Sequence, residues 1–176
     1  MVYQVGDIVL YSSHGVCKVA EIVERDLSGN RIKYYVLKPI YDNNSTVFIP
    51  VSSETLTSKM RDVLSLDEVQ ELIEEIPNKT TIWIDNENAR RDRYKEIVAG
   101  GNRTELVQLI KTLYQTQQVQ KESGKKLHLS DERFMKDAEK MLYEELAHVL
   151  GIECSQVLEF VLPKMITVSK KEEEVV

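Results

Sequence analysis

The sequence predicts an α+β protein in which a small β barrel is followed by an all-helical domain of about five helices. Residues 1–55 contain short runs of β-branched and aromatic residues separated by turn signals, and from Ser65 onward the apolar residues recur with helical spacing. The change of pattern falls between Pro50 and Ser65. We therefore expect a β domain at 1–55, a connector at 56–64, a helical domain at 65–165 and a frayed charged tail at 166–176.

Four strands are expected in the β domain, and residues typical of turns separate them. The expected strands are 8–11, 16–23, 33–40 and 46–49. A unit of about 50 residues buries little surface per residue, so it would be marginally stable alone. Strands that close into a barrel or dock on another surface would relieve this weakness.

The expected helices have start and stop signals. Their expected first residues carry side chains that can accept a hydrogen bond from the first turn: Ser65, which forms a capping box with Glu68, Asn102 and Ser130. The second helix is expected to begin near Asp85. The expected stops are glycine or proline: Pro77, Gly100-Gly101, Gly151 and Pro163, the last limiting a short fifth segment.

Composition and charge limit the classes of function. No apolar run is long enough for a membrane helix, and the first residues lack the features of a signal peptide, so we expect a cytoplasmic protein. The net charge of −6 argues against coating nucleic acid by bulk electrostatics, so any DNA contact must be local. Cys17 and Cys154 are expected to be reduced thiols. Because no nucleophile–base pair, phosphate loop or metal-ligand pattern occurs, we expect no catalysis, no cofactor, no metal and no small-molecule substrate.

Short motifs, in order, give the chain a resemblance to a known family. From the residues alone, Gly6-Asp7 and His14-Gly15 indicate tight turns. With their neighbours, they resemble the opening of the CarD/CdnL family of bacterial RNA polymerase-binding regulators and the related domain of transcription-repair coupling factors. The resemblance covers roughly residues 1 to 162. It rests on Val5-Gly6-Asp7, Val9-Leu10-Tyr11, His14-Gly15-Val16, Tyr35 to Lys38, Thr46 to Pro50, Ala99-Gly100-Gly101, Ala138 to Leu142 and Glu145-Leu146-Ala147.

This resemblance implies that the barrel is Tudor-like and binds the β subunit of RNA polymerase, partly by adding a strand to it. By position, the candidate polymerase contacts are Arg25 and Phe48, with Val47 and Ile49 beside Phe48. Phe48 could instead pack in the core, although strand alternation cannot send all three residues of 47–49 inward. Arg25 could equally be an ordinary loop charge.

The resemblance also implies that the helical domain contacts promoter DNA at the upstream edge of the transcription bubble. In the family, a tryptophan at the start of the second helix wedges into the minor groove near the −10 element, and basic residues contact nearby phosphates. Two lysines in a loop before a capped helix are further phosphate candidates. The candidate DNA contacts in this chain are Trp83, Arg90, Arg91, Arg93, Lys95, Lys125 and Lys126.

The chain departs from this pattern at the tryptophan. Counted back from Gly100-Gly101, the family's tryptophan position falls near Glu87, one helical turn after Trp83. Either the wedge has moved one turn, or Trp83 is a core residue and DNA contact is mostly electrostatic. We favour the second interpretation, because an acidic chain with Glu87 at the matching position is poorly suited to a wedge.

The arginines that follow Trp83 also have alternatives. At about 100° per residue, the arginines at 90, 91 and 93 cannot share one helix face, so one or two could pair with Glu87 or Asp92, and the helix could simply be solvated. Two functional hypotheses remain. The chain either regulates transcription by binding polymerase and altering open-complex stability at promoters, or acts as an adaptor that docks through its barrel without binding DNA.

Overall fold

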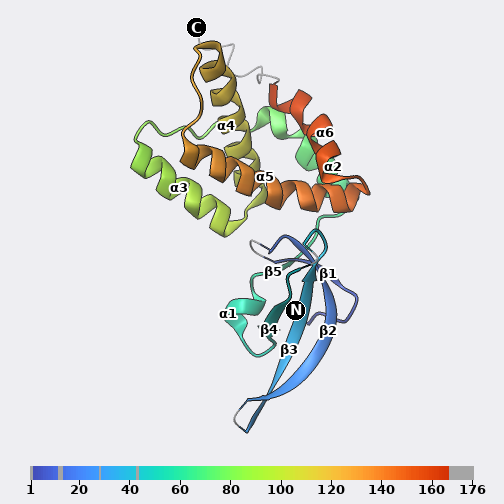
Figure 1. Ribbon diagram of the computed structural model, residues 1–176. Helices are drawn as coiled ribbons and strands as arrows, with labels where there is room; N and C mark the ends of the chain where they lie inside the picture. Colours follow the sequence, from blue (N-terminus) through green and yellow to red (C-terminus); the bar gives the residue numbers. More distant parts are fainter. Residues whose placement is uncertain (1, 12–13, 28, 43, 167–176) are drawn as a thin grey trace. The chain divides into compact units, whose positions relative to one another are not determined.

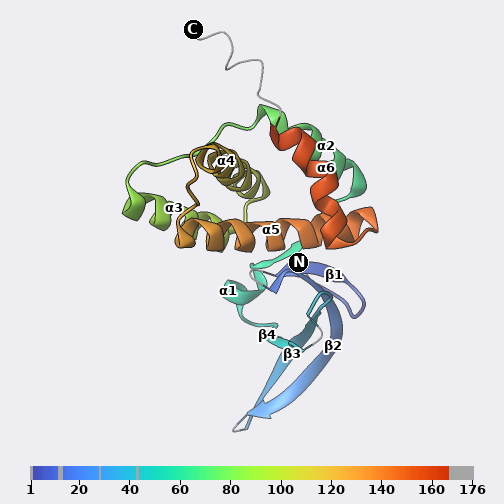
Figure 2. The same cartoon turned by 45° about the horizontal axis from the view of Figure 1, so that its top comes forward.

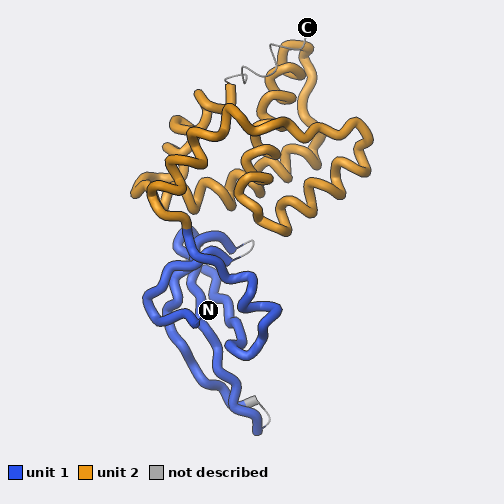
Figure 3. The backbone as a smooth tube through the Cα atoms, turned by 180° about the vertical axis from the view of Figure 1, so that it is seen from behind, with its two compact units in different colours: residues 1–63 blue, residues 64–176 orange. Residues whose placement is uncertain are grey.

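The computed structural model describes residues 2–11, 14–27, 29–42 and 44–166. The chain divides into two compact units, residues 1–63 and residues 64–176, which Figure 3 colours separately. The first contains the strands and the second the longer helices (Figure 1). The expected α+β class is therefore confirmed.

The first unit is built on a five-stranded antiparallel sheet with the order β4-β3-β2-β1-β5. Among the described residues, β4 and β5 are the two edges and do not pair with each other, so backbone hydrogen bonds do not close the sheet into a barrel. The longest pairing joins β2 to β3 (Figure 1). The strands are β1 (Ile8–Tyr11), β2 (Val16–Leu27), β3 (Asn30–Pro39), β4 (Val47–Pro50) and β5 (Met60–Asp62).

Strand alternation gives this sheet one buried face and one more exposed face. The register pairs Tyr35 with Ile49 and Leu37 with Val19, and these four side chains are almost fully buried. The next residue along β4, Phe48, therefore points to the opposite face. Alternation alone predicts that division, and the pairing of β3 with β4 decides which face each residue occupies.

The segment expected to be a connector contains regular structure. Helix α1 (Glu54–Thr57) is followed by β5, and β5 pairs with β1 so that Met60 lies opposite Tyr11. Tyr3 anchors the same strand, because its hydroxyl donates a hydrogen bond to the Met60 carbonyl oxygen at 3.1 Å. Three residues are too few to show an alternating pattern, so only their pairing with β1 makes them a strand.

In the second unit, α5 is the common packing partner. Helices α2, α3, α4 and α6 all contact it, and Figure 2 shows α5 running along the others. A single apolar core joins residues from all of them. The elements are α2 (Leu66–Glu74), the 3₁₀ helix η2 (Ile76–Asn78), α3 (Glu87–Gly100), α4 (Arg103–Glu122), α5 (Leu129–Leu150) and α6 (Cys154–Ile166).

Several of the expected helix ends are confirmed. Ser65 and Glu68 form the capping box, with the Glu68 N–H donating to Ser65 Oγ at 3.3 Å. Asn102 caps α4 through its side chain. Gly101 and Gly151 end α3 and α5 in the left-handed conformation, with φ of 61° and 66°, which glycine adopts without steric cost.

Two expected helix ends are wrong. Helix α5 begins at Leu129, with His128 and not Ser130 in the capping position. Helix α6 runs through Pro163 to Ile166, because its last turn still packs on the core through Met165, which is fully buried. That burial outweighs the hydrogen bond that proline cannot donate. Of the expected frayed tail, residues 167–176 lie outside the described residues.

Candidate functional site

A surface on the outer face of the sheet brings together two of the predicted polymerase contacts. The guanidinium carbon of Arg25 lies 4.2 Å from the centroid of the Phe48 ring. The Tyr34 ring meets Phe48 edge-on, with the centroids 6.4 Å apart. We call Arg25, Tyr34 and Phe48 the sheet patch. An arginine stacked on an aromatic ring presents a planar cation and an apolar surface at one place.

The three consecutive candidates on β4 differ in how exposed their side chains are. Phe48 is 39% exposed, whereas Ile49 is 1% exposed and belongs to the core. Phe48 is therefore not a core residue. Ile49 could contribute to a contact only indirectly, by packing in the core on the opposite face of β4. Val47 is half-buried. In the part of the chain that the structure describes, no strand pairs with the outer edge of β4, so β4 is an edge strand of the sheet.

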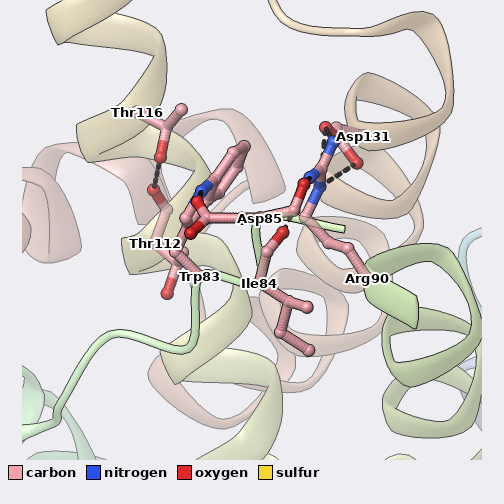
Figure 4. Close-up of polar contacts among 7 residues, drawn as sticks. All are labelled: Trp83, Ile84, Asp85, Arg90, Thr112, Thr116 and Asp131. Carbon is pink, nitrogen blue, oxygen red and sulfur yellow. Dashed lines mark hydrogen bonds and ion pairs between the residues drawn. The ribbon is translucent and has the colours of Figure 1, made fainter. Parts of the chain in front are cut away.

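The second candidate surface is the loop that joins η2 to α3. Trp83 in this loop is 38% exposed, so the expectation that it is a core residue is wrong. Its indole Nε1–H donates a hydrogen bond to Asp85 Oδ1 at 3.0 Å, and the guanidinium carbon of Arg90 lies 4.2 Å from its ring centroid. The indole is thus held by a carboxylate at its N–H and by a cation over its ring (Figure 4).

Arg90 does not lie at the surface, which corrects its assignment as a phosphate contact. It is 3% exposed, and its Nε and Nη2 groups donate to the carboxylate of Asp131, which is 1% exposed, at 3.3 and 3.1 Å. Its Nη1 donates to the carbonyl oxygen of Ile84 at 2.7 Å. The partner is therefore a residue on α5 and not Glu87 or Asp92. Arg90 thus links the tryptophan loop at Ile84 to Asp131 (Figure 4).

Helix α4 holds the other end of the same loop. The Ile82 N–H donates to Thr112 Oγ1 at 2.9 Å, and Gln108 Nε2 donates to the Thr80 carbonyl oxygen at 3.3 Å. The buried ammonium of Lys111 donates to three backbone carbonyl oxygens, among them that of Lys79 at 2.9 Å. A loop anchored at so many backbone atoms presents Trp83 from a fixed position.

Sequence reasoning missed these supporting residues. Asp131, Thr112 and Lys111 are ordinary helix residues whose partners lie far away in the chain. The one available signal was a polar residue at a position where the helix periodicity requires an apolar one.

The remaining cations of α3 differ in whether a carboxylate of the protein pairs with them. Arg91 and Lys95 are exposed, and Arg91 donates to the side chain of Asn88 at 3.2 Å. Arg93 pairs with Glu96 and, at 2.6 Å, with Glu105 on α4, and the hydrogen bond to Glu105 raises the pKa of Arg93. Its charge is thus largely balanced within the protein. Arg91 and Lys95 therefore place exposed positive charge on α3.

The two loop lysines lie together near the end of α4. Lys125 and Lys126 are exposed, and with Lys121 they line a shallow depression that also contains Gln117 and Glu132. Three cations against one carboxylate give this depression a positive charge. It can attract an anion, although nothing in its geometry selects one base sequence.

One buried group beside Arg90 has a shifted pKa. Tyr94 follows Arg90 by one turn on α3 and is fully buried. Burial, together with the negative charge of Asp131, raises its pKa to about 12. The phenol is therefore neutral at physiological pH, and among the described residues its hydroxyl has no hydrogen-bond partner.

Among the described residues, no three histidine, cysteine, aspartate or glutamate side chains come together in a way that could hold a metal ion. No helix in the described ranges combines the length and the apolar character needed to cross a membrane. The sheet patch and the tryptophan loop are thus the two surfaces on which the functional argument rests.

Comparison with known proteins agrees with the motifs of the sequence. Residues 3–64 match the model of the CarD-like/TRCF RID domain family, which spans the first unit. A protein of Bacillus subtilis (strain 168) with the curated name "Putative transcription factor YdeB" is 26% identical over 162 residues, which cover 90% of this chain and 99% of the relative. Residues 3–64 are therefore similar to the CarD-like/TRCF RID domain, and the chain as a whole is similar to a protein named as a putative transcription factor.

Proposed function

We propose that the protein regulates transcription by binding the β subunit of RNA polymerase through its first unit and promoter DNA through its second. The polymerase contact would involve the sheet patch and the open edge of β4. The DNA contact would lie at the upstream edge of the bubble and would alter the stability of the open complex. The observation that carries the proposal is the stacking of Arg25 on the exposed Phe48 ring, in a domain of a polymerase-interacting family.

Arginine and large aromatic residues are enriched among the residues that dominate protein interfaces, and the sheet patch contains both. An open strand edge beside it supplies backbone hydrogen bonds, while the patch supplies side-chain contacts. Phe48 and Arg25 would then form the centre of the interface. Ile49 would support Phe48 from the core, and Val47, on the same face of β4 as Ile49, would pack beside it.

The polymerase half of the proposal is tested by measuring binding of the full chain to the purified β subunit. Phe48→Ala and Arg25→Ala should each weaken binding by about 10-fold or more, the effect typical of a central interface residue. Lys33→Ala is the matched control, because Lys33 is an exposed cation on the same hairpin whose side chain lies on the other face of the sheet. Equal binding by all three variants would reject the sheet patch as the contact.

The DNA half of the proposal relies on Trp83, Arg91, Lys95, Lys125 and Lys126. Trp83 would contact the partly opened minor groove near the −10 element, and the four cations would contact phosphates. Arg93 is retained only as a minor contributor, since Glu96 and Glu105 already balance its charge. An exposed aromatic ring on an anchored loop suits an apolar wedge, because the loop does not have to become ordered when DNA binds.

The competing hypothesis is a polymerase-bound adaptor without DNA contact. It is favoured by the burial of Arg90, which removes one cation from the surface, and by the net charge of −6. A salt titration of binding to a forked promoter fragment, with polymerase present, separates the two hypotheses. DNA contact predicts that replacing Arg91 and Lys95 by alanine lowers the slope of log affinity against log salt by about 2. Alanine at Lys33 and Lys59, two exposed lysines of the first unit, is the control.

A further inference from the structure

The indole of Trp83 is constrained at two places, and each constraint limits what the ring can recognise. Its one hydrogen-bond donor, Nε1–H, is already used by Asp85 Oδ1 at 3.0 Å. The guanidinium of Arg90 covers part of the ring at 4.2 Å from the centroid. Trp83 is nevertheless 38% exposed, and its indole has no second N–H to offer to a partner.

Each of the two constraining residues is itself fixed. Arg90 is 3% exposed and held by Asp131 on α5, and it also donates to the carbonyl oxygen of Ile84, the residue directly after Trp83. Asp85 lies at the beginning of the turn that leads into α3, where the side chain of Asn86 caps the helix by accepting from the Ala89 N–H at 3.0 Å. Side chain and backbone are thus locked together around the indole (Figure 4).

The minor groove can be read only through hydrogen bonds or through shape. Its edges present acceptors at A·T pairs and an additional donor at G·C pairs, so an indole N–H pointed at it could favour A·T. An indole whose N–H is already bonded has no such means of discrimination. Stacking on an unpaired base tolerates every sequence, because every base has a π face.

We propose that Asp85, Arg90 and Asp131 are positioning residues that present Trp83 as a base-stacking surface which recognises an unpaired base by shape and not by identity. The inference rests on the proposed DNA contact and adds its specificity. Asp85 keeps the indole from reading the base edge, and the Arg90–Asp131 pair fixes the plane of the ring.

The test uses Trp83 as its own reporter, because it is the only tryptophan in the chain. The full chain is titrated with fully paired duplexes and with forked duplexes that carry A, C, G or T at the unpaired position. Emission of Trp83 reports stacking, and anisotropy of labelled DNA reports affinity. The wild-type protein should bind the four forks within about twofold of one another, bind the paired duplex more weakly, and lose emission on the forks.

Three variants of exposed carboxylates separate the hydrogen bond from the charge. Asp85→Ala removes acceptor and charge, and freeing the ring should reduce the preference for the fork by about 3- to 10-fold, the cost of ordering one side chain on binding. Asp85→Asn keeps an acceptor without the charge and should retain the wild-type preference and quenching. Asp92→Ala removes a charge from an exposed position of α3 and should also behave as wild type.

The outcomes distinguish this inference from the proposed function. If Trp83→Ala and the wild-type protein bind forks equally, the DNA contact of Trp83 fails, and the inference fails with it. If Trp83→Ala weakens fork binding but Asp85→Ala matches wild type, the DNA contact stands and the positioning role is rejected. If Asp85→Asn behaves as Asp85→Ala, the effect comes from charge, which also rejects it. A difference greater than about fivefold among the four forks would reject recognition by shape.

Discussion

Each unit of the protein places an arginine over an aromatic ring, at the same distance of 4.2 Å, but the surroundings give the two pairs different roles. Arg25 lies on an exposed sheet face, and its guanidinium has no ion-pair partner among the described residues. Arg90 is 3% exposed and bonded to Asp131 and to backbone carbonyl oxygens. The ring contact alone therefore does not define a function: the first arginine can bind a partner, whereas the second supports the loop that carries Trp83.

Burial also gives the two contacts different energies. An exposed cation–π contact contributes about 0.5–1 kcal/mol, because water competes for the cation. A buried ion pair contributes little compared with an apolar replacement, yet removing one partner leaves an unpaired buried charge. Substitutions around Arg90 should therefore change stability, and substitutions of Arg25 should change binding.

The largest effect expected is on the buried pair. Asp131→Ala leaves the Arg90 charge buried without its carboxylate, which should lower the free energy of unfolding of the second unit by about 3–5 kcal/mol. Urea unfolding followed by Trp83 emission measures this unit specifically, since Trp83 is the only tryptophan. Asp137→Ala, an exposed carboxylate on the same helix, should change stability by less than about 0.5 kcal/mol. A loss below about 1 kcal/mol for Asp131→Ala would mean that water reaches Arg90.

A smaller effect is expected at alkaline pH, from Tyr94 beside the same pair. Its pKa is about 12 in the folded protein against 10.0 as the ordinary value, so folding favours the neutral phenol. The contribution of the neutral Tyr94 phenol to the free energy of unfolding is fully present below about pH 10 and is lost as pH rises toward 12. Between about pH 9 and pH 11, the free energy of unfolding of Tyr94→Phe should therefore fall by about 1 kcal/mol less than that of the wild-type protein.

The measurement for Tyr94 is again urea unfolding followed by Trp83 emission, now at both pH values. Tyr34→Phe serves as the control, because Tyr34 belongs to the sheet patch of the other unit. It should leave the pH dependence of the second unit as in wild type. Equal losses in wild type and Tyr94→Phe would mean that the phenol is more hydrated than its burial implies.

The smallest effect on stability is expected from Arg25→Met. This change removes the cation over Phe48 and keeps an apolar side chain, so the stability of the first unit should fall by no more than about 1 kcal/mol. Hydrogen exchange of the β2 and β3 amides measures it. Affinity for the polymerase β subunit should nevertheless decrease. If Arg25→Met strongly destabilised the first unit but left the affinity for the β subunit unchanged, Arg25 would be a structural residue and not a binding residue.

Much of the helical unit could be predicted from the sequence, because its signals are local. The capping box at Ser65 and Glu68, the Asn102 cap and the left-handed glycines at 101 and 151 depend on residues within a turn of one another. The α5 start and the passage of α6 through Pro163 were predicted wrongly. There, packing against distant residues, such as the burial of Met165, decides where the helix begins or ends.

The candidate surfaces were predictable only in part. The sequence pointed to Arg25, Phe48 and Trp83, but it could not distinguish exposed from buried positions among 47–49 or among the arginines from 90 to 93. Strand β5 was missed, because its three residues become a strand only through pairing with β1.

By itself, the sequence determined the resemblance to a family, the change from a strand-rich to a helix-rich unit, and the residue types available for the proposed polymerase and DNA contacts. Local hydrogen bonding and the spacing of apolar residues contain that information. Only the tertiary structure decided which arginine is free and which is a brace, because that depends on Asp131, 41 positions away in the chain. Burial and charge pairing arise from contacts across the fold. They leave the Arg25–Phe48 pair exposed at the surface, whereas they bury Arg90 against the loop that carries Trp83.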